Sequence, residues 1–301
     1  MEPVIRNIDT ADVIVIGGIN MDIGGRPDGR LILRDSNPGR VSMHPGGVGR
    51  NIAHDLCLLG VNTSLIAPLG NDIYGRMLLQ SCEEIGLDMS MAPLLPDYRS
   101  SVYLYLADEK GDMLAAVSDM DITSALTPAL LEPLLPRINA ADAVVMEANL
   151  SEETLSFLAE ACTAPLYADC VSTGKAERLR SALPRLTCLK PNALEAEKLT
   201  GHDDPDRAVR ALLDAGVQRV FLSLGAQGMV ASDGKQTLSL PCEQARIRNT
   251  TGAGDAVTAA IVYGGVMGLD LEASLRLALK AGAVTCECEE ANSPALKELR
   301  L

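Results

Sequence analysis

A short segment near the C-terminal end of the chain combines glycines with a carboxylate in an order suited to phosphoryl chemistry. Thr251-Gly252-Ala253-Gly254-Asp255 leads directly into an apolar run of helical length. The first N–H groups of a helix lack internal partners and its dipole favours negative charge, so such a terminus binds anions. A carboxylate there could take a proton from a hydroxyl while the N–H groups hold the phosphate that the hydroxyl attacks. The spacing predicts Asp255 as a general base and Gly252, Ala253 and Gly254 as an anion hole.

A lone Gly-x-Gly-Asp is a weak signal, because Asp255 could be only a helix-start carboxylate that the dipole stabilises. A second cluster, Pro-Gly-Gly-Val-Gly-Arg-Asn at 45–51, precedes a predicted helix. It half-matches a dinucleotide fingerprint, but Ile52 stands at the third glycine position and no clear strand precedes it. The phosphate-loop pattern Gly-x4-Gly-Lys-Ser/Thr does not occur. An NAD site is therefore disfavoured, and a nucleotide would have to bind without a Walker motif.

Composition and charge narrow the choice of partners and compartment. The 301 residues are 47% apolar, enough for a large core, and their net charge of −14 disfavours binding to nucleic acid. The eight cysteines show no Cys-x-x-Cys spacing, so no zinc site is expected and a reduced compartment fits best. The N-terminal residues lack a signal-peptide pattern, and no apolar run is long enough to cross a bilayer. We expect a cytoplasmic protein with no membrane or nucleic-acid partner.

The elements that must position these residues alternate between apolar runs and helical stretches. Strands are predicted at 13–16, 64–67, 143–146, 166–168, 188–189 and 220–223, and helices at 49–59, 73–85, from 151 onward, 253–266 and 271–285. This alternation predicts an α/β fold with a mostly parallel central sheet and helices on both faces. Ligands in such sheets bind beyond the carboxyl ends of the strands, where the glycine and acidic motifs lie.

Two stretches, 30–43 and 100–118, break this alternation because they lack a helical period. The run 101–106 is β-rich and is followed by a turn signal at 109–112. We expect a small β-sheet lid, formed by about 24–45 and 98–119 and inserted into a single domain that spans 1–301. Ordinary surface loops are the alternative, although long structureless loops are uncommon in compact domains.

Four ordered motifs together resemble the ribokinase-like (PfkB-type) carbohydrate kinases over nearly the whole chain. They are Gly-Ile-Asn-Met-Asp at 18–22, the glycine cluster at 45–51, Leu-Lys-Pro-Asn-Ala-Leu-Glu at 189–195 and Asn-Thr-Thr-Gly-Ala-Gly-Asp at 249–255. The resemblance implies a kinase that transfers the γ-phosphoryl group of ATP to a sugar hydroxyl with Mg²⁺. Three further segments, 35–39, 119–122 and 149–153, look like those of the pseudouridine kinases. They imply phosphorylation of the 5′-hydroxyl of pseudouridine to pseudouridine 5′-phosphate, with Asp255 as the base.

The same resemblance implies a role for each motif. Asn20, Asp22 and Asn51 would bind the sugar hydroxyls, and Gly46 and Gly47 would let backbone N–H groups approach. Candidates for contact with the base come from the lid, where each could equally be lid structure: Asp35, Asn37, Ser101 and Tyr103.

On the nucleotide side the resemblance implies contacts with the phosphates, purine and ribose of ATP. Glu195 would organise Mg²⁺ through water, although a helix-start Asn followed by a surface Glu is the plain alternative. Glu147, which directly follows the predicted strand 143–146, is a second acidic candidate for the same site. The remaining nucleotide-binding candidates are Asn192, Ser223, Gly225, Gly228 and Asn292, with a plain hairpin turn as the rival for the segment 223–228.

Several questions stay open at this point. Many relatives have an aspartate near a monovalent-cation site where this chain has Asn249, so activation by K⁺ is not settled. The alternatives to pseudouridine as the acceptor are a kinase for ribose, adenosine or a sugar phosphate, and a non-catalytic nucleoside or sugar sensor on the same fold. A sugar phosphate would call for a basic cluster at the lid, such as Arg26, Arg30, Arg34, Arg40 and Arg99. A lid with one apolar face would also favour a symmetric homodimer.

Overall fold

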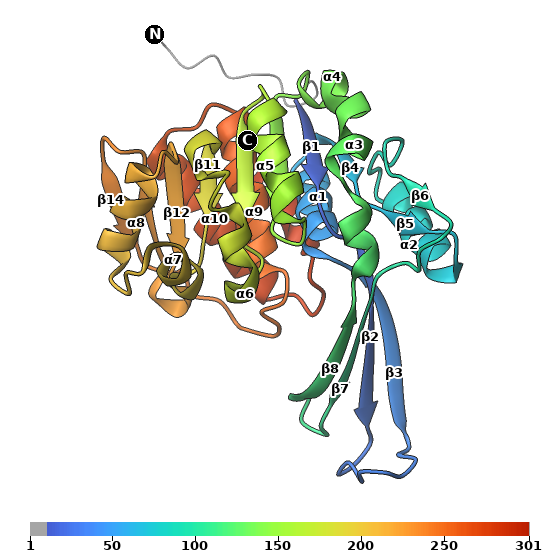
Figure 1. Ribbon diagram of the computed structural model, residues 1–301. Helices are drawn as coiled ribbons and strands as arrows, with labels where there is room; N and C mark the ends of the chain where they lie inside the picture. Colours follow the sequence, from blue (N-terminus) through green and yellow to red (C-terminus); the bar gives the residue numbers. More distant parts are fainter. Residues whose placement is uncertain (1–10, 301) are drawn as a thin grey trace.

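The computed structural model describes residues 11–300, which form a large twisted sheet with a smaller sheet projecting from it (Figure 1). The large sheet has eight strands in the order β14-β13-β12-β11-β10-β9-β1-β4. Six neighbouring strands are parallel, and an antiparallel pair completes one edge. The bounds are β1 Asp12–Ile16, β4 Asn62–Ile66, β9 Ala143–Glu147, β10 Leu166–Asp169, β11 Cys188–Lys190, β12 Arg219–Ser223, β13 Met229–Ser232 and β14 Thr237–Leu240.

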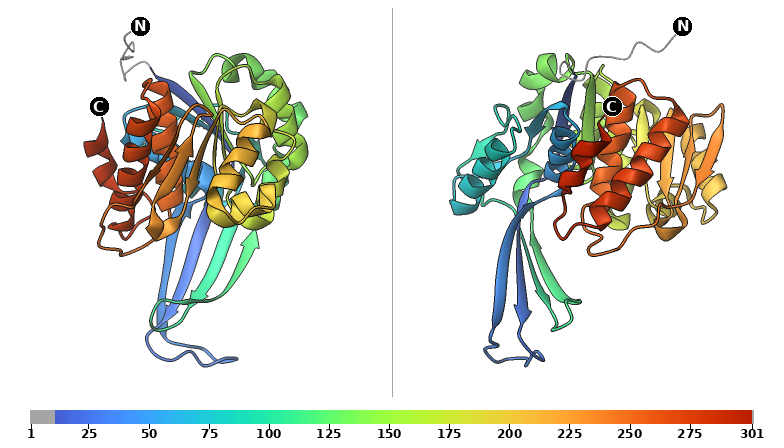
Figure 2. Two further views of the ribbon diagram at one scale, coloured as in Figure 1. Left: turned by 90° about the vertical axis from the view of Figure 1, so that its left-hand side faces the viewer. Right: turned by 180° about the vertical axis from the view of Figure 1, so that it is seen from behind.

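Helices cover both faces of this sheet because its central strands alternate between two apolar cores (Figure 2). In β1, Val13 and Val15 face one core while Ile14 and Ile16 face the other. The first core is completed by α1 Val48–Leu58, α2 Ile73–Glu84, α9 Ala253–Val266 and α10 Leu271–Cys286. The second contains residues of α3 Pro128–Leu131, α4 Leu135–Ile138, α5 Glu152–Ala161, α6 Thr173–Ala176, α7 Ala193–Thr200 and α8 Pro205–Asp214. The predicted α/β class is confirmed.

The small sheet has the strand order β3-β2-β7-β8 and extends away from the body of the molecule (Figures 1 and 2). Two antiparallel pairs, β2–β3 and β7–β8, are joined by a parallel contact between β2 and β7. Every residue of β8 is exposed. The bounds are β2 Asn20–Pro27, β3 Gly39–Gly46, β7 Val102–Ala107 and β8 Met113–Asp119. A separate two-stranded ribbon pairs β5 Leu69–Gly70 with β6 Leu94–Leu95.

The glycine cluster at 45–51 departs from expectation, because a strand does precede it. That strand is β3, whose first six residues are exposed. An exposed strand lacks the continuous apolar run that marks a buried one, so the pattern in the sequence hid it. Among the described helices, none has both the length and the apolar character needed to cross a membrane.

Candidate active site

The first turn of α9 presents unpaired N–H groups, as the sequence predicts. Gly252 caps this helix with φ 82°, and a Cβ atom there would collide with the carbonyl oxygen of Ala291, so only glycine fits. No described residue accepts a hydrogen bond from the N–H groups of Gly252, Gly254 or Asp255. The N–H of Ala253 makes a long contact of 3.4 Å to the carbonyl of Thr250. The helix terminus therefore offers at least three donors to an anion.

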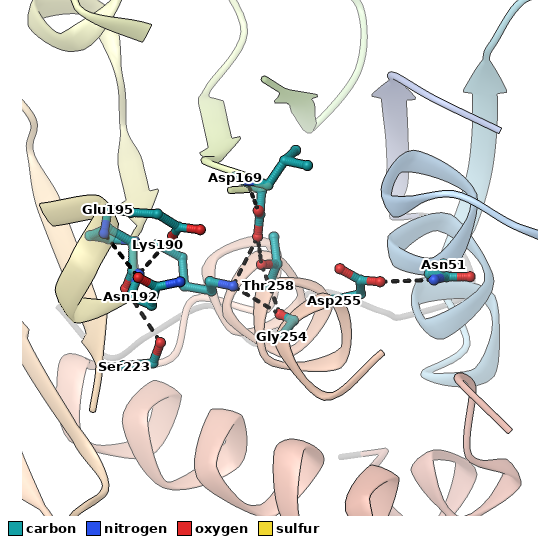
Figure 3. Close-up of polar contacts among 11 residues, drawn as sticks. Asn51, Asp169, Lys190, Asn192, Glu195, Ser223, Gly254, Asp255 and Thr258 are labelled. Atoms are coloured by element: carbon teal, nitrogen blue, oxygen red, sulfur yellow. Dashed lines mark hydrogen bonds and ion pairs between the residues drawn. The ribbon is translucent and has the colours of Figure 1, made fainter. Parts of the chain in front are cut away.

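Asp255 lies in the same turn as these N–H groups and is hydrogen-bonded to a side chain of α1 (Figure 3). Its Oδ2 accepts a hydrogen bond of 2.8 Å from Nδ2 of Asn51. Burial raises the pKa of Asp255 from 3.8 to about 7, and the negative charge of Asp169 adds to the effect, while Asn51 and Lys190 oppose it. A carboxylate whose pKa lies near neutrality is suited to accept a proton during a reaction.

A buried ion pair holds the first turn of α9 in place. Asp169 and Lys190 are register partners at the ends of β10 and β11, with Nζ of Lys190 3.0 Å from Oδ2 of Asp169. Lys190 also donates to the carbonyl of Gly254 at 3.2 Å, and the Thr258 hydroxyl donates to Asp169 at 2.6 Å (Figure 3). Our interpretation of the sequence did not single out these residues. The available signal was a charged residue at the end of each of two short buried strands.

The opposite wall of the site is built from the start of β2. Nδ2 of Asn20 donates to Oδ1 of Asp22 at 2.6 Å. The carboxylate of Asp22 lies over Gly46, where a Cβ atom would collide with it. Burial raises the pKa of Asp22, while Asn20 and the positive charges of His44 and Arg50 oppose that shift. The predicted sugar-binding residues Asn20, Asp22 and Gly46 are thus brought together.

Two buried polar atoms near this wall lack a hydrogen-bond partner among residues 11–300. They are Oδ1 of Asn51 and Oγ of Ser101, whose backbone carbonyl accepts from the N–H of Met21. Buried polar groups are normally hydrogen-bonded, so these two atoms are available to a hydroxylated ligand. Tyr103 is the register partner of Asp22, and its ring lies 6.1 Å from that of Tyr105.

The structure places Asp35 away from this site. Asp35 lies in the connection between β2 and β3, at the end of the small sheet farthest from the body (Figure 1). The seven residue steps from Asn20 to Pro27 span roughly 23 Å at a strand's usual rise. Within one chain Asp35 therefore does not reach a ligand at Asp22, and a single chain does not support the prediction that it contacts the substrate. Its neighbour Asn37 bonds the backbone of Ile32 and of Asp35 itself.

Asn292 also has a different place from the one expected. It is buried, and its Nδ2 donates to Oδ1 of Asp55 at 2.9 Å and to the carbonyl of Asn51 at 3.1 Å. The amide therefore braces α1 behind the site instead of facing a nucleotide. Asp55 was also missed from the sequence, because a helix pattern alone does not show that an aspartate is fully buried.

Comparison with known proteins shows which family the chain belongs to. A model described as pfkB family carbohydrate kinase matches residues 10–298. The chain belongs to the pfkB family of carbohydrate kinases. It is 36% identical to the pseudouridine kinase of Escherichia coli K12 over 292 residues, which cover 94% of this chain and 93% of that protein.

Solved structures agree with the fold of this kinase. A carbohydrate kinase from Agrobacterium tumefaciens matches with a TM-score of 0.86 and 29% identity, over 96% of both chains. The ribokinase of Arabidopsis thaliana, solved with ribose and ATP, matches with a TM-score of 0.84 and 20% identity, over 96% of this chain and 98% of that one. The protein is thus a phosphotransferase whose acceptor is a hydroxyl group, and its family implies that it uses ATP.

The segment predicted to contact the nucleotide contains a capping box at the start of α7 (Figure 3). Oδ1 of Asn192 accepts from the N–H of Glu195 at 2.9 Å, and Oε2 of Glu195 accepts from the N–H of Asn192 at 2.8 Å. Glu195 is buried, so it is not the surface residue of the plain alternative. Its second carboxylate oxygen has no partner among the described residues. The motif therefore shapes the helix start and still leaves one oxygen free.

The segment 223–228 forms the turn between antiparallel β12 and β13, as the rival interpretation held. Ser223 bridges to Asn192, and its hydroxyl donates to the carbonyl of Pro191 at 3.4 Å. Gly228 has φ 103°, and a Cβ atom there would collide with the carbonyl of Leu240, so the turn itself explains this glycine. Open space surrounds Gly225, which leaves room for a ligand.

Proposed function

We propose that this kinase transfers the γ-phosphoryl group of ATP to the 5′-hydroxyl of pseudouridine. The observation that carries the chemistry is the position of Asp255, a carboxylate with a pKa of about 7 beside the unpaired N–H groups of α9. The choice of acceptor is supported by 36% identity to a bacterial pseudouridine kinase over almost the full length of both chains.

In this proposal one group of residues binds the sugar, and another group acts on the proton and the phosphoryl group. Asn20, Asp22 and Asn51 hold the ribose hydroxyls, with Oδ1 of Asn51 and Oγ of Ser101 gaining the partners that they lack. Asp255 takes the proton of the 5′-hydroxyl as that oxygen attacks phosphorus. The N–H groups at the start of α9 stabilise the transferred phosphoryl group. Positioning and charge stabilisation dominate phosphoryl transfer, so this set of residues is sufficient for the protein's part.

The residues present also fit a magnesium ion bound with the nucleotide. Among residues 11–300 no group of three or more histidines, cysteines or acids could hold a metal by itself. Mg²⁺ usually keeps several waters and is held by one or two carboxylates together with substrate phosphates. The free oxygen of Glu195 suits such a contact through water. The ion would neutralise charge on the phosphates of ATP. As a separate point, the eight free cysteines suit a cytoplasmic enzyme.

A sugar phosphate is a weaker candidate for the acceptor. Arg26 and Arg40 are register partners near the far end of the small sheet, where Arg26 donates to the carbonyl of Glu109 at 2.6 Å. The residue steps along β2 from Asn20 to Arg26 amount to roughly 20 Å of strand. A phosphate held there would keep its sugar away from Asp255. A non-catalytic sensor is disfavoured for another reason, since it would not need a base whose pKa is raised toward neutrality.

Asn249 is expected to make the enzyme independent of K⁺. Its Nδ2 donates to the carbonyl of Glu289 at 2.9 Å, and its Oδ1 accepts from the N–H of Thr251 at 3.0 Å. The neutral amide therefore links the segment before α9 to the segment after α10. A cation placed there would lose the carboxylate that many relatives provide.

We also propose a homodimer formed through the small sheet. Strand register places Ile23, Met43, Leu104 and Val117 in one row on the face opposite Asp22. Three of the four are exposed, with Val117 at 66%. A row of exposed apolar side chains on a thin sheet favours a second copy of the same surface, related by a twofold axis.

A coupled ADP-release assay tests the function directly. We would supply ATP and Mg²⁺ with pseudouridine, uridine, adenosine, ribose or fructose 6-phosphate. Pseudouridine is expected to give the highest kcat/KM, with the product phosphorylated at O5′ by phosphorus NMR. Preference for another acceptor would replace the substrate but keep Asp255 as the base, and no turnover of any acceptor would favour the sensor.

A further inference from the structure

A short segment after α10, residues 289–292, contacts both helices that contribute to the candidate active site. The carbonyl of Glu289 accepts a hydrogen bond of 2.9 Å from Nδ2 of Asn249. Two residues later, the carbonyl of Ala291 packs against Gly252, where a Cβ atom would collide with it. Both contacts join the segment to the turn that begins α9.

The last residue of the segment, Asn292, contacts α1 instead. Its Nδ2 donates two hydrogen bonds, one of 3.1 Å to the carbonyl of Asn51 and one of 2.9 Å to Oδ1 of Asp55. Asn51 and Asp55 are one helical turn apart, so they lie on the same face of α1. All three residues are buried. A single amide therefore ties two successive turns of α1 to the segment that contacts α9.

The start of α1 depends on such support because it lacks the usual capping groups. Gly47 precedes the helix without a side-chain hydrogen bond, and no acid lies in the first turn. A side-chain cap or a first-turn acid normally stabilises a helix start. Asn51 is the fourth residue of this helix. The bond from Asn292 therefore fixes a part of α1 that has no side-chain cap of its own.

Asn51 links this support to the proposed reaction. Its side chain points from α1 toward Asp255, and its Nδ2 donates to Oδ2 of that carboxylate at 2.8 Å (Figure 3). This is the one side-chain hydrogen bond that Asp255 makes to residues 11–300. A displacement of Asn51 would therefore free the carboxylate to turn away from the N–H groups of α9.

Burial favours the neutral form of Asp55, the second residue that Asn292 contacts. Its Oδ2 is buried and has no hydrogen-bond partner among the described residues. Burial raises the pKa of Asp55 well above its usual value of 3.8, and the charge of Asp255 adds to the rise, while Asn292 and Arg50 oppose it. A neutral Asp55 accepts the bond from Asn292 without placing a second negative charge behind Asp255.

We propose that Asn292 and Asp55 are positioning residues for phosphoryl transfer, which act by fixing Asn51 and, through it, the carboxylate of Asp255 beside the anion hole. The proposal rests on the proposed function, since it requires Asp255 to be the base. Neither residue has to contact the acceptor or the nucleotide. Their contribution is the precise placement of a reacting group, and a misplacement of about 1 Å can lower a rate by about a hundredfold.

The first test compares Asn292→Ala and Asp55→Ala with the wild type in steady-state kinetics. Each variant should lower kcat by about tenfold or more, because Asn51 is no longer held against Asp255. KM for ATP should change by less than about twofold, since the residues proposed to bind the nucleotide are unchanged. Asp55→Asn should keep kcat within about twofold of the wild type, because it retains a neutral acceptor oxygen for Asn292.

A double-mutant cycle shows whether the effect passes through Asn51. In an Asn51→Ala background, Asn292→Ala should lower kcat by less than about twofold further, because the contact that it supports is already gone. Losses that multiply independently in the double variant would overturn the proposal. Wild-type kcat in folded Asn292→Ala and Asp55→Ala would overturn it as well.

The pH dependence of kcat/KM is a readout that a loss of stability alone would not move. The bond from Asn51 lowers the pKa of Asp255, so the acid limb of Asn292→Ala should move to higher pH. Asp55→Asn should leave the limb unchanged, because a neutral Asp55 adds no charge near Asp255. An unmoved limb in Asn292→Ala would contradict the proposal. The charged groups that face Asp255 or Asp55 and stay in place in both variants are Asp169, Lys190, Glu147 and Arg50.

The matched control is Asn139→Ala. The Asn139 amide also joins two segments, since it donates to the carbonyl of Ala161 at 3.2 Å and accepts from the N–H of Thr163 at 2.8 Å. It precedes β9, at the edge of the sheet opposite the anion hole. Its loss should lower the melting temperature without changing kcat or the acid limb. Thermal melting checks that each variant is folded, and Asn292→Ser or Asp55→Ser repeats the test where an alanine variant is not.

Failure of this proposal can be told from failure of the proposed function. Turnover like that of the wild type in Asp255→Asn would remove the base, and both proposals would fall. A large loss in Asp255→Asn together with unchanged kcat in folded Asn292→Ala and Asp55→Ala would overturn the positioning role alone. The measurements use whichever acceptor the wild type phosphorylates, so a different substrate leaves this test intact.

Discussion

The first turn of α9 and the small sheet are held in place in different ways. The turn of α9 rests on Lys190 and Asp169, whose side chains are only 9% and 5% exposed. The small sheet projects from the body, and its edge strand β8 is exposed along its whole length. The proposed reacting groups are therefore fixed by a buried network, whereas the proposed recognition of the acceptor involves a projecting sheet whose edge strand is exposed.

The two regions also differ in charge. Burial raises the pKa of Asp255, of Glu147 and of Glu195, and the negative charge of Asp169 adds to each of these shifts. On the small sheet, the apolar face is the unusual feature. The carboxylates with raised pKa values therefore lie around the proposed base, Asp255. The exposed apolar side chains lie on the small sheet, where we propose that a second copy binds.

Of the substitutions considered, Asp255→Asn should lower the activity most. Loss of a general base is expected to lower kcat by about 10²–10⁴-fold, and steady-state kinetics would measure it. The matched control is Asp206→Asn, since Asp206 also lies in the first turn of a helix but outside the site. Turnover like that of the wild type in Asp255→Asn would remove Asp255 from the mechanism.

The same substitution should stabilise the fold in a pH-dependent way. The folded-state pKa of Asp255 is raised from 3.8 to about 7, so the wild type loses stability from this group as pH rises through that window. The asparagine of the variant carries no charge, so the melting temperature of the variant should gain on the wild type between about pH 4 and pH 7. A gain that shrinks as pH rises would contradict the assigned shift.

Lys190→Met should test the buried network against an exposed ion pair. Removing one partner of a buried pair costs about 3–5 kcal/mol of unfolding free energy. Lys198→Met breaks the pair with Glu177, in which both side chains are about half exposed, and should cost less than about 1 kcal/mol. Urea denaturation of the two variants gives the comparison. Equal losses would mean that the buried pair does not anchor α9.

Val117→Asp should affect the small sheet alone. A charge on its apolar face is expected to convert the dimer to a monomer, which light scattering would detect. Ala116→Asp is the matched control, because Ala116 lies next to Val117 on the opposite face of β8. A wild type that is already monomeric would disprove the proposed dimer.

The smallest effect is expected from the monovalent cation. Replacing K⁺ by a large organic cation should leave kcat unchanged, since the Asn249 amide already links the two segments that a cation would join. Strong activation by K⁺ would show that backbone carbonyls alone can build the cation site.

The sequence was informative wherever a function depends on local order along the chain. The glycines and carboxylate at 252–255 lie at a helix start as predicted, whereas the hydrogen bond from Asn51 to Asp255 was not predicted. The sequence did not show the contacts that depend on strand register and on packing between distant elements. The pairing of Asp169 with Lys190 and the burial of Asp55 arise from elements that are distant in sequence.

Two expectations differ from the structure for separate physical reasons. Asp35 was proposed as a residue of the lid, and Asn292 as a nucleotide-binding residue. The length of β2 instead carries Asp35 to the far end of the small sheet, and packing against α1 turns Asn292 inward. Motif order locates a segment, but only the three-dimensional path of the chain shows which side chains face the ligand.

The most direct test of the account is the pH dependence of kcat/KM with pseudouridine. If Asp255 is the base, the rate should fall on the acid side with a pKa of about 7, and Asn51→Ala should move that limb upward because the hydrogen bond that favours the carboxylate is lost. A rate that stays constant down to about pH 5 in the wild type would show that Asp255 does not accept the proton.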